Sequence, residues 1–160
     1  APSTTSEKRA ELPMGLFDKN YIANNTCHII PNGNLFLFGQ LTSLMHMSWV
    51  KYTCGRLESR FRYSKDLVYN NYPFPKNVSE KQKKAVEEKA QNVLDIRASF
   101  SDCSLADLYD PLSMPPNLKK AHQELDKAVD NCYGSKLFKN DKERIEFLFG
   151  LYEEYLNTQK

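Results

Sequence analysis

In this 160-residue sequence, residues that could bind a charged ligand are most concentrated in a basic, aromatic stretch at residues 51–65. It has five basic residues and one acidic residue. Its cations are Lys51, Arg56, Arg60, Arg62 and Lys65. Successive side chains of an extended segment point to opposite faces, so SRFRYS places its two arginines on one face and its two aromatic residues on the other. Guanidinium groups bind phosphate oxygens and guanine edges. These five cations are therefore candidate DNA-binding residues.

The residues themselves also allow a structural interpretation of the same stretch. Arginines on an edge strand prevent that edge from pairing with another sheet. Pro73 and Pro75 follow in NNYPFP, and a proline cannot donate a ladder hydrogen bond, so we expect no regular strand there. Composition and spacing alone leave both interpretations, DNA contact and solvated edge strand, open.

The sequence contains no convincing catalytic motif. There is no glycine-rich phosphate loop and no G-x-S-x-G motif. In NNYPFP a phenylalanine separates the prolines, unlike the Asn-Pro-Pro-Tyr motif of adenine methyltransferases. His122 and Asp126 lie one turn apart, but we expect His122 to pack on the apolar face of a helix and Asp126 to lie off that face. We predict no catalytic or cofactor-binding residue in the chain.

The cysteines do not indicate a disulfide or a metal site. Cys27, Cys54, Cys103 and Cys132 are widely spaced and form no C-x-x-C motif, which favours reduced thiols. A cluster of Cys27, His28, His46 and Cys54 fits no standard zinc spacing. We therefore predict no metal site.

Hydrophobic periodicity predicts the elements that must position the basic stretch. We expect a strand at 21–31, one helix at 34–55, a helix starting at a Ser79–Gln82 capping box, and a helix at 118–133 closed by Gly134. A final helix follows an expected Asn140–Glu143 capping box, with an apolar stripe made of Ile145, Leu148, Phe149, Tyr152, Tyr155 and Leu156. The predicted fold class is α+β: a short, β-containing part at 1–78 and a mostly α-helical bundle at 79–160.

Charge is unevenly distributed between these two parts, although the net charge is only +2. Residues 1–78 carry nine basic and five acidic residues, whereas residues 79–160 carry thirteen and fifteen. We therefore expect only the first part to meet a polyanion. No segment has the length and apolarity of a membrane span or signal peptide, so we expect a cytoplasmic protein without a membrane partner. Because the sequence starts with Ala1, we expect a processed chain or a piece of a longer one.

Long stretches of the sequence resemble one known family. LTSLMHMSWV, GRLESRFRYS and YNNYPFP resemble the end of the target-recognition domain in fused restriction–methylation enzymes of the MmeI type. LADLYDPLSMPPNLKKAHQELDKAVDNCYG and RIEFLFGLYEEY are similar to the helical C-terminal segment of that family. The resemblance covers nearly the whole chain.

This resemblance implies a fragment of a bacterial adenine-specific DNA methyltransferase or restriction–modification enzyme. Its implied partners are double-stranded DNA and the upstream methyltransferase domain of the parent chain, which would bind S-adenosylmethionine and carry catalysis. We expect the fragment alone to be inactive. The alternative, from another class, is a stand-alone helical protein-interaction module with a basic edge strand.

Overall fold

The computed structural model describes residues 1–134 and 138–158. Helices dominate, and a small antiparallel sheet lies beside them, so the predicted α+β class is confirmed. The strands are β1 (Thr4–Thr5), β2 (Gly55–Leu57) and β3 (Arg60–Arg62). The helices are α1 (Leu35–Thr42), α2 (Leu44–Thr53), the π-helix η1 (Lys65–Tyr69), α3 (Glu80–Ala98), α4 (Leu105–Leu108), α5 (Pro116–Cys132) and α6 (Asp141–Thr158).

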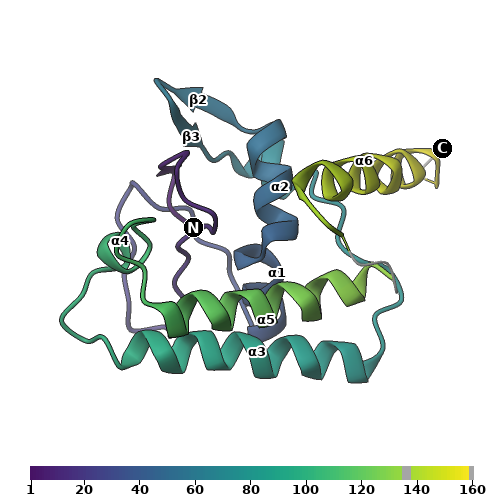
Figure 1. Cartoon of the computed structure of the whole chain (residues 1–160). Helices are drawn as coiled ribbons and strands as arrows, with labels where there is room; N and C mark the ends of the chain where they lie inside the picture. Colours follow the sequence, from purple (N-terminus) through teal and green to yellow (C-terminus); the bar gives the residue numbers. More distant parts are fainter. Residues whose placement is uncertain (135–137, 159–160) are drawn as a thin grey trace.

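Helices α3 and α5 form the base of the fold and run antiparallel, side by side (Figure 1). The predicted Ser79–Gln82 capping box starts α3, and Gly134 has the positive φ of 128° expected beyond the end of α5. Helix α1 packs onto this pair at Gly39. A Cβ atom at Gly39 would lie only 2.6 Å from Val86 Cγ1, so the glycine permits this close approach.

The predicted helix at 34–55 is broken at Ser43, which corrects our expectation of one continuous element. Ser43 has extended backbone angles (φ −80°, ψ 162°) and begins α2 as its N-cap, with its hydroxyl accepting from the His46 amide. The same hydroxyl donates to Gln40 O at 2.7 Å. Serine competes with helical hydrogen bonding in this way, which explains the break.

The predicted strand at 21–31 is also wrong. The structure has only an isolated bridge there, between Pro2 and Cys27. Asn24 Oδ1 accepts from both the amide and the hydroxyl of Thr26, which closes a local turn instead of a ladder. Ile22 is consequently 99% exposed.

The sheet has the order β1-β3-β2, with both pairs antiparallel. Arg62 pairs with Thr4 on one side and with Gly55 on the other, so β3 is the central strand. The alternative interpretation of SRFRYS as an edge strand is therefore wrong, because the short strand β1 pairs with β3 on that side. The predicted alternation is confirmed: Phe61 and Tyr63 are buried, whereas Arg60 and Arg62 are exposed.

Helix α6 projects from the body of the fold (Figure 1). It contacts mainly α2, and it buries Ile145 and Leu148. Of the other members of the predicted apolar stripe, Tyr152 and Tyr155 are half-buried, and Phe149 and Leu156 are exposed. Because α6 packs against the rest of the fold along one narrow side, this contact buries only part of the wide apolar stripe.

Candidate nucleic-acid interface

The basic stretch forms a β-hairpin, β2–β3, that extends from the end of α2 away from the α3–α5 base (Figure 1). Glu58 and Ser59 form its turn. Glu58 has a positive φ of 56°, a left-handed conformation that is uncommon for residues other than glycine. The hairpin thus presents a narrow two-stranded ribbon with exposed side chains at its turn.

One face of this ribbon carries Arg60 and Arg62. Residues directly opposite each other in an antiparallel pair share a face, so Leu57 lies beside Arg60, and Thr4 and Gly55 lie beside Arg62. Arg60 Nη2 lies 3.0 Å from Glu58 Oε2 in an exposed ion pair. Within the described residues, the Arg62 side chain has no hydrogen bond or ion pair, and its guanidinium is available to a ligand.

Arg56 lies on the other face, because its partner in the ladder is Phe61. The guanidinium carbon lies 4.1 Å from the centroid of the Phe61 ring. Arg56 Nη1 also donates to the carbonyl oxygen of Ser59 at 3.1 Å. The two strands therefore separate Arg56 from the two outward arginines.

The two predicted lysines have different surroundings. Lys51, in the last turn of α2, has its Nζ 2.5 Å from Asp141 Oδ2 at the start of α6, and its side chain is 28% exposed. Lys65, at the start of η1, is 71% exposed and lies 3.9 Å from Asp66 Oδ1. Of the five predicted cations, the structure brings Arg60 and Arg62 to one face of the sheet and places Lys51 and Arg56 elsewhere.

Aromatic packing beneath the sheet fixes β3 against α2. The Tyr63 hydroxyl lies 3.0 Å from His46 Nε2, and the His46 ring meets Tyr72 edge-on. Burial lowers the pKa of His46 to about 3, so this imidazole is neutral at physiological pH. Trp49 Nε1 donates to Val68 O at 3.0 Å and ties η1 to α2. The hairpin therefore has a rigid base.

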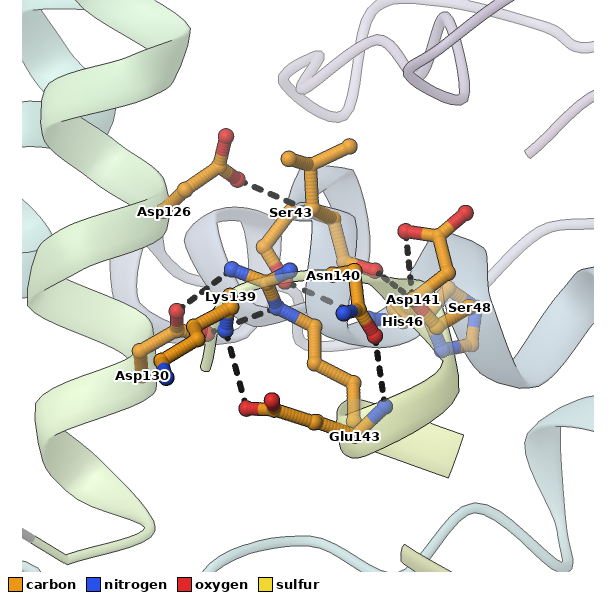
Figure 2. A network of polar contacts seen from close by, with 11 residues as sticks. Ser43, His46, Ser48, Asp126, Asp130, Lys139, Asn140, Asp141 and Glu143 are labelled. Carbon is orange, nitrogen blue, oxygen red and sulfur yellow. Dashed lines mark hydrogen bonds and ion pairs between the residues drawn. The ribbon is translucent and has the colours of Figure 1, made fainter. Parts of the chain in front are cut away.

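A polar network joins α2 to the helical part of the chain (Figure 2). Asp126 Oδ1 accepts from the Leu44 amide at 2.8 Å, at the start of α2. Asp141 Oδ1 accepts from the Ser48 hydroxyl at 3.2 Å. These carboxylates from α5 and α6 satisfy polar groups of α2, so the helices from residue 79 onward set the orientation of the element that leads into the hairpin.

Beside this network, Arg144 makes a buried ion pair with Asp130. Arg144 Nη2 lies 2.6 Å from Asp130 Oδ2, and Nε donates to Oδ1 at 3.2 Å. Burial raises the pKa of Asp130, and Arg144 opposes this effect. The pair joins α5 to α6 in a two-point geometry that favours a fixed orientation.

Sequence reasoning missed this network, and it misplaced Asp126, which is 5% exposed and so lies on the buried side of α5. Burial, opposed by the Leu44 amide, raises the pKa of Asp126 to about 7. The available signal was the spacing of His122, Asp126 and Asp130, four residues apart, which puts all three on one helix face.

His122 is a packed core residue, as expected. It is fully buried, and its Nε2 lies 2.6 Å from the Tyr109 hydroxyl. Arg97 donates to the same hydroxyl. Burial, together with the charge of Arg97, lowers the pKa of His122 to about 3. Its surroundings are those of a structural hydrogen-bonded cluster.

The structure gives no cluster of metal ligands among residues 1–134 and 138–158: no three His, Cys, Asp or Glu side chains there could hold an ion together. All four cysteines are free thiols. An open pocket of about 560 Å³ lies beside the hairpin, between residues 27–31 and η1. In the same described part, no helix combines the length and apolarity needed to cross a membrane.

Comparisons with known proteins agree with this arrangement. Residues 1–76 match the family model "MmeI, target recognition domain", and residues 78–159 match "MmeI, C-terminal domain". The chain is 42% identical over 153 residues to DNA methyltransferase A of Bacillus subtilis (strain 168), which covers 96% of this chain and 17% of that protein.

A solved structure is also similar: the Type IIL restriction–modification enzyme MmeI in complex with DNA. It superposes with a TM-score of 0.92 at 47% identity, over 98% of this chain and 21% of that one. The chain therefore spans about a fifth of the length of the relatives it matches. From these matches, the chain belongs to the MmeI family, with sequence from the target recognition domain followed by the C-terminal domain.

Proposed function

We propose that this chain is the DNA-recognition end of a longer bacterial adenine-specific DNA methyltransferase or restriction–modification enzyme, and that its β2–β3 hairpin contacts duplex DNA. The observation that carries the proposal is the exposed face with Arg60 and Arg62 on a projecting ribbon. A two-stranded β-ribbon fits the major groove of B-DNA. The similarity to MmeI, a protein whose structure is known in complex with DNA, supports this assignment.

The remaining cations would contribute unequally. Lys65 is exposed and follows β3, so it can reach a neighbouring phosphate. Lys51 would have to exchange its contact with Asp141 for one with DNA. Arg56 would have to leave the Phe61 ring. We therefore rank Arg60 and Arg62 first, Lys65 second, and Lys51 and Arg56 last as DNA contacts.

Catalysis would belong to upstream domains of the parent chain. There a methyltransferase domain would bind S-adenosylmethionine and methylate the amino group of an adenine flipped out of the duplex. Residues 1–78 would form the recognition part and residues 79–160 the helical part. The exposed Phe149 and Leu156 of α6 suit packing against an upstream domain. The chain alone would be inactive.

A salt titration with Arg62→Ala tests the proposed DNA contact. Each lost phosphate contact lowers the slope of log affinity against log salt by about one. Arg62 is exposed, and its side chain makes no hydrogen bond with the residues that the structure describes, so its removal should leave folding intact. Lys142→Ala is the matched control, because Lys142 is an exposed cation on α6, outside the hairpin. Equal slopes for wild type, Arg62→Ala and Arg60→Ala would contradict the proposal.

A further inference from the structure

We propose that Arg56 is a positioning residue, which holds the turn of the hairpin so that Arg60 and Arg62 face DNA, and that it does not contact phosphate itself. This inference rests on the proposed DNA-binding function and assigns a distinct role to one of its cations. It follows from the contacts of the Arg56 side chain within the hairpin.

The Arg56 side chain connects three parts of the hairpin. Its backbone belongs to β2, its guanidinium lies 4.1 Å from the ring centroid of Phe61 in β3, and its Nη1 donates to Ser59 O in the turn. Both contacts use the planar guanidinium at once. Arg56 is solvent-exposed, but its ladder partner is Phe61, so it lies on the face of the ribbon opposite to the one that carries Arg60 and Arg62.

The turn needs such a contact because it lies beyond the part of β3 that β1 covers, since β1 pairs only with Phe61 and Arg62. Each strand has only three residues, and the turn contains Glu58 with a positive φ of 56°. The tip of the hairpin has only two strands, and two-stranded pairings of this size are marginally stable in water. Beyond the ladder itself, the polar contacts of the turn within the described residues are the exposed Glu58–Arg60 ion pair and the Arg56–Ser59 hydrogen bond.

Lysine cannot replace arginine in this role, and that difference separates the two possible functions of Arg56. A lysine ammonium keeps the charge needed for a phosphate contact. It lacks the planar guanidinium, which can stack on an aromatic ring and at the same time donate a hydrogen bond from its edge. A phosphate contact should therefore survive Arg56→Lys. A positioning contact should be lost in Arg56→Lys as well as in Arg56→Ala.

The first test uses DNA. A preferred duplex is selected from a randomised pool with the wild-type chain, and its affinity is compared with that of a random duplex. We expect Arg56→Lys and Arg56→Ala to lower the ratio of the two affinities by about fivefold, with the salt slope on random DNA unchanged. If Arg56→Ala lowers that slope by about one and Arg56→Lys restores it, Arg56 is a phosphate contact and the proposal is wrong.

The second test needs no DNA and so separates the two proposals. Amide hydrogen exchange of the free chain reports local opening of the hairpin. We expect both Arg56 variants to speed exchange across residues 55–62 by about fivefold, with α3 and α5 unchanged and with no effect of Arg62→Ala. Unchanged exchange in the Arg56 variants would overturn the positioning role. Failure of the wild-type chain to bind any duplex would instead contradict the proposed function.

Discussion

Four arginines of this protein lie in two regions with opposite surroundings. In the hairpin, Arg60 and Arg62 are exposed, and Arg60 has only an exposed acidic partner. In the helical part, Arg97 and Arg144 are buried and fully engaged. Arg97 donates to the Tyr109 hydroxyl and to Met14 O, and Arg144 is paired with Asp130.

This contrast ties the proposed role of each arginine to its burial: recognition for the exposed ones and architecture for the buried ones. A buried guanidinium without a partner carries a large desolvation cost, so its neighbours must satisfy it. An exposed guanidinium remains hydrated and can exchange water for a phosphate or a base edge. Substitutions in the helical region should therefore change folding, whereas substitutions in the hairpin should change binding.

The largest effect should come from breaking the buried pair with Asp130→Asn. This change leaves the Arg144 charge buried without its counter-ion, which typically costs about 3–5 kcal/mol. Urea unfolding of the two proteins measures the difference. The double variant Asp130→Leu with Arg144→Met should recover most of the loss, because it removes both charges. A loss below about 1 kcal/mol for Asp130→Asn would mean that the pair behaves like a surface contact.

The free energy of unfolding should depend on pH through a buried group of the helical part, the carboxyl of Asp126. Burial raises the pKa of Asp126 from its ordinary 3.8 to about 7. The folded state therefore binds a proton more tightly than the unfolded state, and this stabilisation is complete below pH 4 and is lost as pH rises to about 7. The loss should approach roughly 4 kcal/mol, at about 1.4 kcal/mol per pH unit.

Asp126→Asn isolates this effect, because asparagine can still accept from the Leu44 amide without ionising. The groups around Asp126 are Glu11 and Asp130, which oppose its ionisation, and Arg144, which favours it. Burial also raises the pKa of Glu11 and Asp130, so they add a decline of the same sign in both proteins. Urea unfolding at pH 4 to 8 should show a shallower decline for the variant. Parallel pH profiles would contradict the assignment.

Substitutions at two glycines, one packed and one open, test packing without changing any charge. Gly39→Ala would place Cβ 2.6 Å from Val86 Cγ1 and 3.2 Å from Leu125 Cδ1, so we expect a loss of about 1–3 kcal/mol from overpacking. Gly150→Ala meets no atom within 4 Å in α6 and should stabilise the helix by about 0.5–1 kcal/mol. Thermal unfolding would measure both. Equal signs would show that helix propensity, not the α1–α3 contact, governs Gly39.

The sequence was sufficient where local physics decides the structure. The Ser79–Gln82 capping box, the apolar face of α5, the alternation of Phe61 with its neighbouring arginines and the α+β class are all confirmed. These features depend on residues within a few positions of one another. Periodicity and capping chemistry report such relations directly.

The sequence was insufficient where distant residues decide the structure. The break at Ser43 depends partly on Asp126, 82 residues from Leu44, which accepts from the first amide of α2. The central position of β3 depends on its pairing with Thr4 and Thr5, which lie near the N-terminus. The different surroundings of Lys51 and Arg62 depend on whether an acid such as Asp141 lies nearby in space. No pattern of local spacing contains these relations.

The smallest effect should come from Glu58→Gln, the counterpart of Asp130→Asn on the exposed side of the comparison. Both changes replace one carboxylate of an arginine pair with an amide, but the Glu58 side chain is 77% exposed and its Arg60 partner 49%. Exposed pairs contribute about 0–1 kcal/mol, and salt screens them, so we expect a change below about 0.5 kcal/mol that disappears in 1 M salt. Urea unfolding at low and high salt measures it. A loss comparable to that of Asp130→Asn would mean that the Glu58–Arg60 pair holds the hairpin, and the division between recognition and architectural arginines would then fail at its exposed end.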